Sequence, residues 1–94
     1  MKYYDWNDEK NELLKVLREV SFEEVVLAIE KGDLLDRRRH PNSAKYPNQM
    51  VFYVRINGYV YVVPFAEDDE KIFLKTIIPD RKAADKYSGG RGDE

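Results

Sequence analysis

The chain has 94 residues, of which 43% are hydrophobic and 36% are charged, and its net charge is −2 at pH 7. This length is enough for one modest core, so we expect a single domain. The chain has no cysteine, which excludes disulfides, thiolate metal sites and a cysteine nucleophile. The first residues lack the apolar stretch of a signal peptide, and the longest apolar run, residues 59–66, is too short to span a membrane. We therefore expect a cytoplasmic protein without membrane insertion.

Acidic and basic residues are segregated along the chain. Residues 1–36 contain five Lys or Arg and ten Asp or Glu, whereas residues 37–64 contain five basic residues and no acid. The negative total argues against a nucleic-acid-binding domain, because phosphate contacts usually require a basic one. The net charge, however, conceals an acidic N-terminal segment, residues 1–36, and a basic central segment, residues 37–64.

Two helices are expected in the acidic part. Residues 8–20 have acids in the first turn and a stripe of apolar residues at helical spacing, namely Leu13, Leu14, Leu17 and Val20. Ser21 and Glu24 have the spacing of a capping box, in which each side chain accepts from the other residue's backbone N–H, and this predicts the start of a second helix. That helix should end near residue 31, where Gly32 supplies a left-handed cap.

A basic loop and a hairpin should follow. Residues 36–48 combine three consecutive arginines with prolines and asparagines, which is typical of a loop. Residues 49–56 and 59–65 are rich in β-branched and aromatic residues. The Asn57-Gly58 pair between them suits a two-residue type I′ turn, in which both residues have positive φ.

This turn also predicts which side chains share a face of the sheet. With two turn residues, one face carries three cross-strand pairs, which are Ile56 with Tyr59, Val54 with Tyr61 and Phe52 with Val63. The other face carries Tyr53, Arg55, Val60 and Val62. We expect the first face to join the core and Arg55 to point away from the helices.

The last part of the chain predicts one more strand and a short helix. Residues 67–70 form an acidic turn, to which we assign no metal because it lacks the spaced ligands of a calcium loop. Residues 71–78 should pair with the preceding strand, and Asp80 can cap a helix over residues 81–87. The resulting α+β domain, residues 1–87, has two N-terminal helices, a three- to four-stranded antiparallel meander and a short C-terminal helix, and residues 88–94 are expected to be a flexible tail.

Several basic side chains are candidates for phosphate contacts. They are Arg37, Arg38, Arg39, Lys45, Lys82 and Lys86. Arginines suit bidentate binding of phosphate, but the same run fits an acidic partner protein or a solvated surface. Lys75, Arg81, Lys82 and Lys86 lie on the last strand and helix, where they can border one cleft with Arg55. His40 is the only histidine, so a two-histidine acid/base scheme is impossible.

Three separated blocks of the sequence carry a family resemblance. They are residues 4–11 (Tyr-Asp-Trp-Asn-Asp-Glu-Lys-Asn), residues 20–24 (Val-Ser-Phe-Glu-Glu) and residues 77–83 (Ile-Ile-Pro-Asp-Arg-Lys-Ala). They resemble, in the same order, blocks that recur in BrnT-type toxins of bacterial toxin–antitoxin pairs. The similarity covers most of residues 3–87.

The resemblance implies a RelE-like fold and RNA cleavage that halts translation. It also implies neutralisation by a cognate DNA-binding antitoxin, with which the chain would form a hetero-oligomer. Residue by residue, Lys10 and Asn11 fall on the family's Lys-Asn pair, His40 on a histidine after the second helix, and Arg81 on the arginine before the terminal helix. No metal or other cofactor is implied.

The third block departs from the family pattern. Pro79-Asp80 replaces Ser-Ala, and Thr76 stands where the family often has an arginine, with Lys75 one residue earlier. In a regular strand, Lys75 and Thr76 would point to opposite faces. The basic group at this place would then be displaced or lost.

The hypothesis is metal-independent RNA cleavage by a type II toxin. Arg55 and Arg81 would bind phosphate, and His40 or Lys75 would transfer the proton. The alternative is a non-catalytic binding module, in which the acidic helices or the arginine run contact a partner protein. An enzyme acting on a small molecule has no signature in the sequence.

Overall fold

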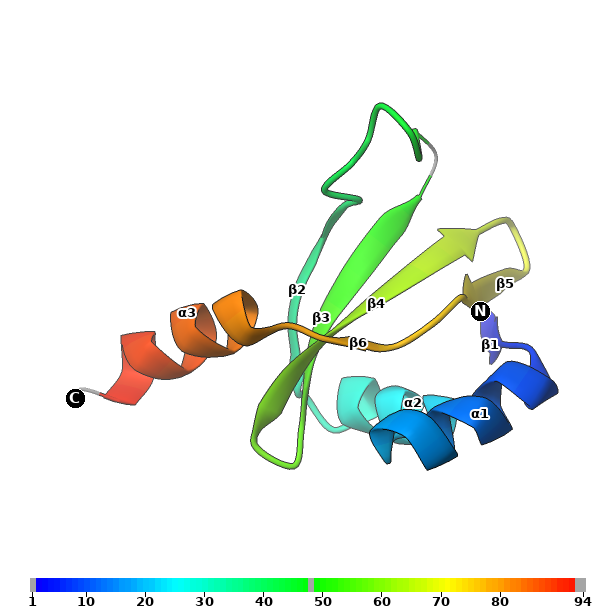
Figure 1. The fold of residues 1–94 in the computed structure, drawn as a ribbon. Helices are drawn as coiled ribbons and strands as arrows, with labels where there is room; N and C mark the ends of the chain where they lie inside the picture. Colours follow the sequence, from blue (N-terminus) through cyan, green and yellow to red (C-terminus); the bar gives the residue numbers. More distant parts are fainter. Residues whose placement is uncertain (1, 48, 93–94) are drawn as a thin grey trace.

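The chain forms three helices and six strands in a computed structural model that describes the backbone of residues 2–47 and 49–92 and the side chains of residues 2–47 and 49–86. In chain order (Figure 1), the elements are β1 (Tyr3–Asp5), α1 (Asp8–Arg18), α2 (Phe22–Glu30), β2 (Leu34–Arg39), β3 (Met50–Ile56), β4 (Tyr59–Glu67), β5 (Lys71–Leu74), β6 (Ile78–Pro79) and α3 (Arg81–Gly92).

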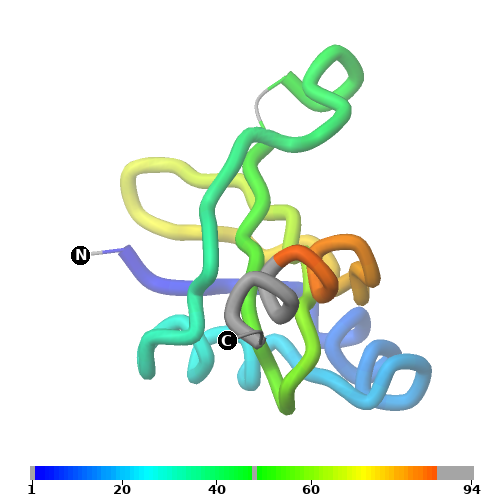
Figure 2. The backbone as a smooth tube through the Cα atoms, turned by 90° about the vertical axis from the view of Figure 1, so that its left-hand side faces the viewer, coloured from blue at the N-terminus to red at the C-terminus, as the bar shows by residue number. Residues whose placement is uncertain are grey.

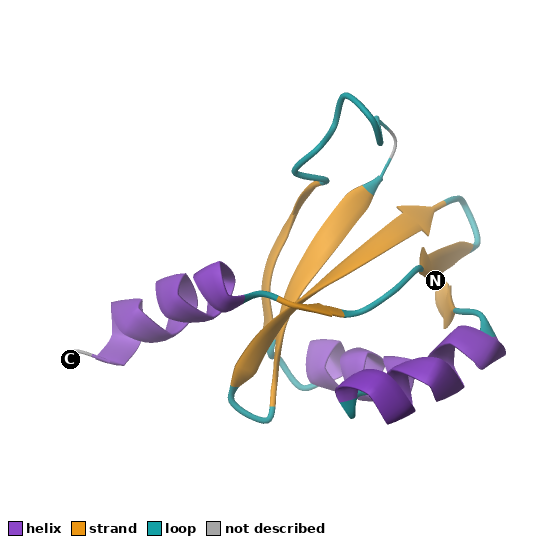
Figure 3. Cartoon of the chain, in the orientation of Figure 1, coloured by secondary structure: helices purple, strands orange, loops and turns teal. Residues whose placement is uncertain are grey.

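The strands form one mixed sheet in the order β1-β5-β4-β3-β2, with β6 paired to β4. All described pairings are antiparallel except the parallel pairing of β1 with β5. Helices α1 and α2 pack together on one side of the sheet, and α3 leaves it on the other (Figure 3). The predicted α+β class is therefore confirmed, whereas the sheet is larger than the predicted three- to four-stranded meander.

The hairpin has the predicted turn and register. Asn57 and Gly58 have φ values of 53° and 80°, and the three predicted pairs, from Ile56 with Tyr59 to Phe52 with Val63, are all present. Phe52, Val54, Ile56 and Val63 join the core beneath α1 and α2. The predicted core face is thus confirmed.

Residues 36–39 are not the loop that the sequence predicted. They belong to β2, which pairs with β3 at the edge of the sheet. An edge strand exposes its outer side, so it can carry charged residues that also discourage pairing with another chain. Composition therefore indicated a solvated segment correctly, but the hydrogen bonds to β3 make it a strand.

Residues 75–77, which lie outside any strand, divide the predicted last strand into β5 and β6. Phe65 pairs with Leu74 and Val62 pairs with Ile78, so three steps along β4 correspond to four steps along its partner. One extra residue in this segment breaks the alternation of side chains. Simple strand alternation therefore does not govern Lys75 and Thr76, and Ile77 is fully buried.

The terminal helix begins as predicted but continues further. The Ala83 backbone N–H donates to the Asp80 carboxylate at 3.0 Å, which is the predicted cap. Helix α3 extends to Gly92, where the sequence predicted an end at residue 87 because glycine is a poor helix former. Of the predicted tail, residues 88–92 are helical, and residues 93 and 94 lie outside the described part.

Helix α1 is rotated relative to the predicted apolar stripe. Leu14 and Val20 are buried, but Leu13 and Leu17 have exposed fractions of 49% and 67%. Asn11, which lies three residues before Leu14 on the same side of α1, is buried as well, with an exposed fraction of only 3%. A polar residue therefore decides how α1 faces the core.

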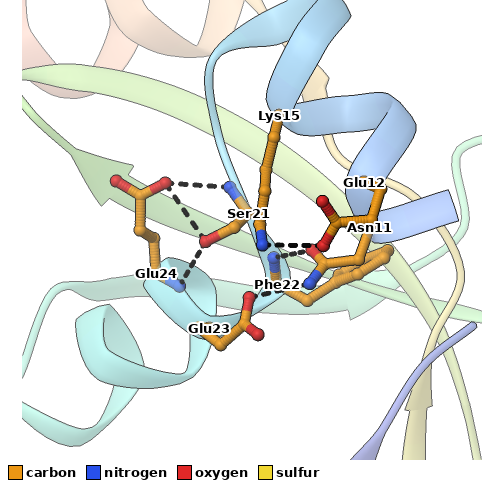
Figure 4. A network of polar contacts seen from close by, with 7 residues as sticks. All are labelled: Asn11, Glu12, Lys15, Ser21, Phe22, Glu23 and Glu24. Carbon is orange, nitrogen blue, oxygen red and sulfur yellow. Dashed lines mark hydrogen bonds and ion pairs between the residues drawn. The ribbon is translucent and has the colours of Figure 1, made fainter. Parts of the chain in front are cut away.

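Asn11 connects the two N-terminal helices (Figure 4). Its side-chain oxygen accepts from the Phe22 backbone N–H at 2.8 Å, and its side-chain nitrogen donates to the Glu23 carboxylate at 2.8 Å. The predicted capping box of Ser21 and Glu24 is present beside it. The backbone N–H groups at the start of α2 therefore have acceptors both in α1, from Asn11, and in the capping box. These hydrogen bonds hold the start of α2 against α1.

We predict that Asn11→Ala lowers the free energy of unfolding by about 1–3 kcal/mol, because it leaves a buried N–H without an acceptor. Urea denaturation followed by circular dichroism measures this loss. Glu12→Ala, on the exposed side of the same helix, serves as the control and should change stability by about 0.5 kcal/mol or less. Equal stability of the two variants would contradict the role assigned to Asn11.

Candidate functional site

An open pocket of about 230 Å³ lies where the sheet meets α3. It is lined by Arg38, Tyr53, Asp80, Lys82, Ala83 and Lys86. Three of these side chains are cationic and one is a phenol. Of the predicted RNA-binding residues, Arg38, Lys82 and Lys86 are therefore brought together here.

The register of the sheet explains how these residues meet. Arg38 pairs with Val51, and Tyr53 is two residues further along β3, so Arg38 and Tyr53 share the face opposite Phe52 and the core. Lys82 and Lys86 are one turn apart on α3 and lie on one side of it. The Asp80 backbone N–H donates to the Val60 carbonyl at 3.1 Å, which anchors the start of α3 on this face.

The acids near this pocket are already engaged. Asp80 caps α3 through the Ala83 N–H, and Asp36 forms a 3.0 Å ion pair with Arg38. The pocket therefore offers more positive than negative charge to a ligand. Arginine and lysine suit a phosphate diester, and an aromatic ring offers a surface on which a base can stack.

Two predicted phosphate ligands lie beside this pocket but do not line it. Arg81 is exposed at the first position of α3. Arg55 is half-buried and contributes to a second pocket, of about 200 Å³, together with Glu24, Leu27 and Lys31. Arg55 pairs with Val60, so its position in the strand is on the face opposite Val54 and Ile56, as strand alternation predicted.

The two candidates for proton transfer are separated from the pocket. His40 follows β2 in a loop that projects from the sheet (Figure 2), and its Nδ1 accepts from the Asn42 N–H at 3.0 Å. Its backbone N–H bonds the carbonyl of Gln49, four residues from Tyr53 or roughly 13 Å along the strand. Lys75 is exposed next to Pro64, on the far side of β4 from β3.

The loop after β2 has its own aromatic cluster. The rings of His40 and Tyr46 are 4.5 Å apart, and the Lys45 ammonium lies 5.4 Å from the Tyr46 ring centre. Lys45, a predicted RNA-binding residue, is therefore next to His40 but belongs to this loop and not to the pocket.

The three arginines of β2 are split between the two faces of the sheet. Arg37 pairs with Phe52 on the core side, lies over the Phe65 ring at 5.5 Å and bonds Glu67 at 2.5 Å. Arg39 shares that side, opposite Met50, and is exposed. Arg37 thus covers the end of the core, while Arg38 alone of the three reaches the pocket.

Sequence patterns did not single out three of the pocket residues as candidates, namely Tyr53, Asp80 and Ala83, and of these Tyr53 supplies the aromatic ring. The signal was present, because alternation placed Tyr53 on the same face as Arg55. Its importance depends on α3 returning over that face, which strand patterns do not reveal.

The part of the chain that the structure describes has neither a grouped set of metal ligands nor a membrane-spanning helix. Within it, no three His, Asp or Glu residues are placed so that they could hold a metal ion together. None of its helices is long and apolar enough to cross a membrane.

The fold and this pocket define a small α+β domain with a basic site between its sheet and its last helix. Comparisons with protein-family models, with curated proteins and with solved structures find no match to this chain. Any inference about function therefore depends on the residues themselves.

We predict that Glu67→Gln makes stability less sensitive to acid. Hydrogen bonding to Lys2, followed by the charge of Arg37, lowers the pKa of the Glu67 carboxyl. A carboxylate whose pKa is lowered by folding stabilises the native state above its unfolded pKa of about 4.3, and this contribution is lost as the pH falls through the folded value. Urea denaturation at pH 7 and pH 3 should give a smaller difference for the variant than for the wild type, and an equal difference would refute this role.

Proposed function

We propose that this chain is a toxin of the BrnT type, with a RelE-like fold, that binds and cleaves RNA without a metal ion and is neutralised by a DNA-binding antitoxin. The pocket formed by Arg38, Tyr53, Lys82 and Lys86 is the observation that carries the proposal. The three blocks of family resemblance support it. Residues 20–24 form the junction between α1 and α2, and residues 77–83 lead into α3, which lines the pocket.

The pocket cations have a clear role in such a reaction. The ribose 2′-oxygen attacks the adjacent phosphorus as it loses its proton to a base, and the 5′-oxygen of the next nucleotide leaves with a proton. Negative charge grows on the phosphate oxygens during attack, so fixed cations stabilise the transition state. We assign this role to Arg38 and Lys82, with Lys86 and Arg81 binding the neighbouring backbone.

The base is assigned to Lys75 or His40, neither of which lines the pocket, so the RNA strand would have to extend beyond the pocket to reach them. In His40, Nδ1 already accepts a hydrogen bond, so in the neutral ring Nε2 carries the proton and acts as a donor. His40 therefore suits a hydrogen bond to the leaving oxygen better than proton abstraction. Lys75 is then the remaining candidate for the proton acceptor.

We predict that Arg38→Gln combined with Lys82→Gln weakens binding of a single-stranded RNA oligonucleotide by about tenfold or more. The slope of the logarithmic salt dependence should also decrease in magnitude by about 0.7 for each phosphate that the variant no longer neutralises. Fluorescence anisotropy with labelled RNA at several salt concentrations measures both quantities.

Lys31→Gln is the matched control, because the Lys31 side chain is exposed on the helical side of the sheet. Combining it with Lys15→Gln, at another exposed lysine of the helices, matches the loss of two charges. If the pocket variant binds RNA as the wild type does, or if Lys15→Gln with Lys31→Gln weakens binding equally, the pocket is not the RNA site.

A second candidate function, a non-catalytic protein-binding module, is favoured by one surface. Leu13, Val16 and Leu17 form an exposed apolar face on α1, with exposed fractions of 49%, 77% and 67%. Exposed apolar patches of this kind often contact another protein. For such a module, the sheet and the basic pocket only support the binding surface.

We predict that Arg38→Gln combined with Arg81→Gln abolishes growth inhibition by the expressed chain and preserves binding to its antitoxin, because both side chains are assigned to phosphate contacts and neither lies on the helical side of the sheet. The antitoxin to test is the product of the adjacent downstream reading frame. Growth curves, RNA integrity and co-purification give the three readouts.

Loss of partner binding with unchanged RNA integrity would favour the binding module. The toxin proposal fails if the wild-type chain, freed of its partner, leaves RNA intact and does not slow growth.

A further inference from the structure

A groove of about 510 Å³ runs between β1 and α2, at the edge of the sheet. It is lined by Lys2, Tyr3, Tyr4, Trp6, Val26 and Glu30. Half of these residues are aromatic. The groove is separate from the basic pocket, which lies between the sheet and α3.

The aromatic wall of the groove is built into the fold. The Trp6 ring stacks on the buried Phe22 ring, with centroids 5.6 Å apart, and Tyr4 packs against the core through its half-buried side chain. Tyr3, in contrast, is 54% exposed. The groove therefore presents one open ring and two fixed ones, which lowers the entropy lost when a ligand binds.

Glu30 is the one carboxylate among the described residues that line this groove. Lys2, the cation on its rim, is held by Glu67 at 2.6 Å, whereas no cation in residues 2–47 or 49–86 forms an ion pair with Glu30. Burial raises the pKa of the Tyr4 phenol, the charges of Glu30 and Glu67 raise it further, and the charge of Arg37 opposes them. The groove thus disfavours phosphate, in contrast to the basic pocket.

Aromatic rings beside a carboxylate are suited to a guanidinium group. Arginine stacks on aromatic faces through cation–π contact while its N–H groups bind a carboxylate. Because β1 lies at one edge of the sheet, an extended chain segment can reach the groove from solvent.

We propose that this groove binds an arginine-bearing segment of a partner protein, with the guanidinium between Tyr3 and Trp6 and hydrogen-bonded to Glu30. This site does not depend on the proposed RNA cleavage. It assigns protein recognition to the acidic side of the domain and leaves the basic side for a polyanion.

The chain supplies its own reporter for the test, because Trp6 is its only tryptophan. We predict that a blocked Gly-Arg-Gly-Arg-Gly peptide causes a saturable change in Trp6 fluorescence of the full chain. The same peptide with neutral citrulline in place of arginine should bind at least about fivefold more weakly, since it keeps the shape and loses the charge.

Matched variants identify the carboxylate. Glu30→Gln should weaken binding of the arginine peptide by about fivefold, whereas Glu9→Gln, an equal charge change on the exposed side of α1, should leave it unchanged. Circular dichroism and thermal unfolding verify that both variants fold as the wild type does.

The proposal is overturned if the arginine and citrulline peptides bind equally, if Glu30→Gln has no effect, or if no saturable change occurs. It is also overturned if an RNA oligonucleotide competes for the groove as well as the peptide does. The Arg38→Gln and Lys82→Gln double variant should still bind the peptide normally, so failure of the RNA proposal and failure of this one can be distinguished.

Discussion

The two-residue turn at Asn57 and Gly58 is the constraint on which the rest of the structure depends. Positive φ at both residues sets the register of β3 and β4, and a shift by one residue would exchange the two faces of both strands. Phe52 and Val54 would leave the core, and Tyr53 and Arg55 would enter it. The core and the basic pocket are thus opposite results of the same register.

That register gives the domain two faces of different chemistry. Under one face lie the acidic helices and the aromatic groove near Glu30, and on the other α3 brings two lysines towards Arg38 and Tyr53. The separation along the sequence, acidic first and basic later, becomes a separation in space because the helices precede the sheet and pack on only one side of it. The protein partner and the polyanion that we propose would therefore occupy separate surfaces.

Local chemistry was readable from the sequence, and long-range pairing was not. The capping box and the type I′ turn each depend on two neighbouring residues with a specific hydrogen bond or φ value, so both were predicted correctly. Strand β2 was missed because its arginines are typical of a loop, and β1 because three residues carry too little pattern. The orientation of α1 was wrong since a buried Asn11 binds the start of α2, a contact that hydrophobic periodicity ignores.

The site shows the same limit. The sequence singled out basic residues as candidates, but which of them meet in one pocket depends on the strand or helix that each one occupies. Once residues 36–39 form a strand, alternation separates Arg37, which covers Phe65, from Arg38, which lines the pocket. Three consecutive arginines therefore have at least two different roles, and the charge of the run as a whole is a poor guide to phosphate binding. What identifies Arg38 is its neighbours, Tyr53 and the lysines of α3, which come from parts of the chain far from it in sequence.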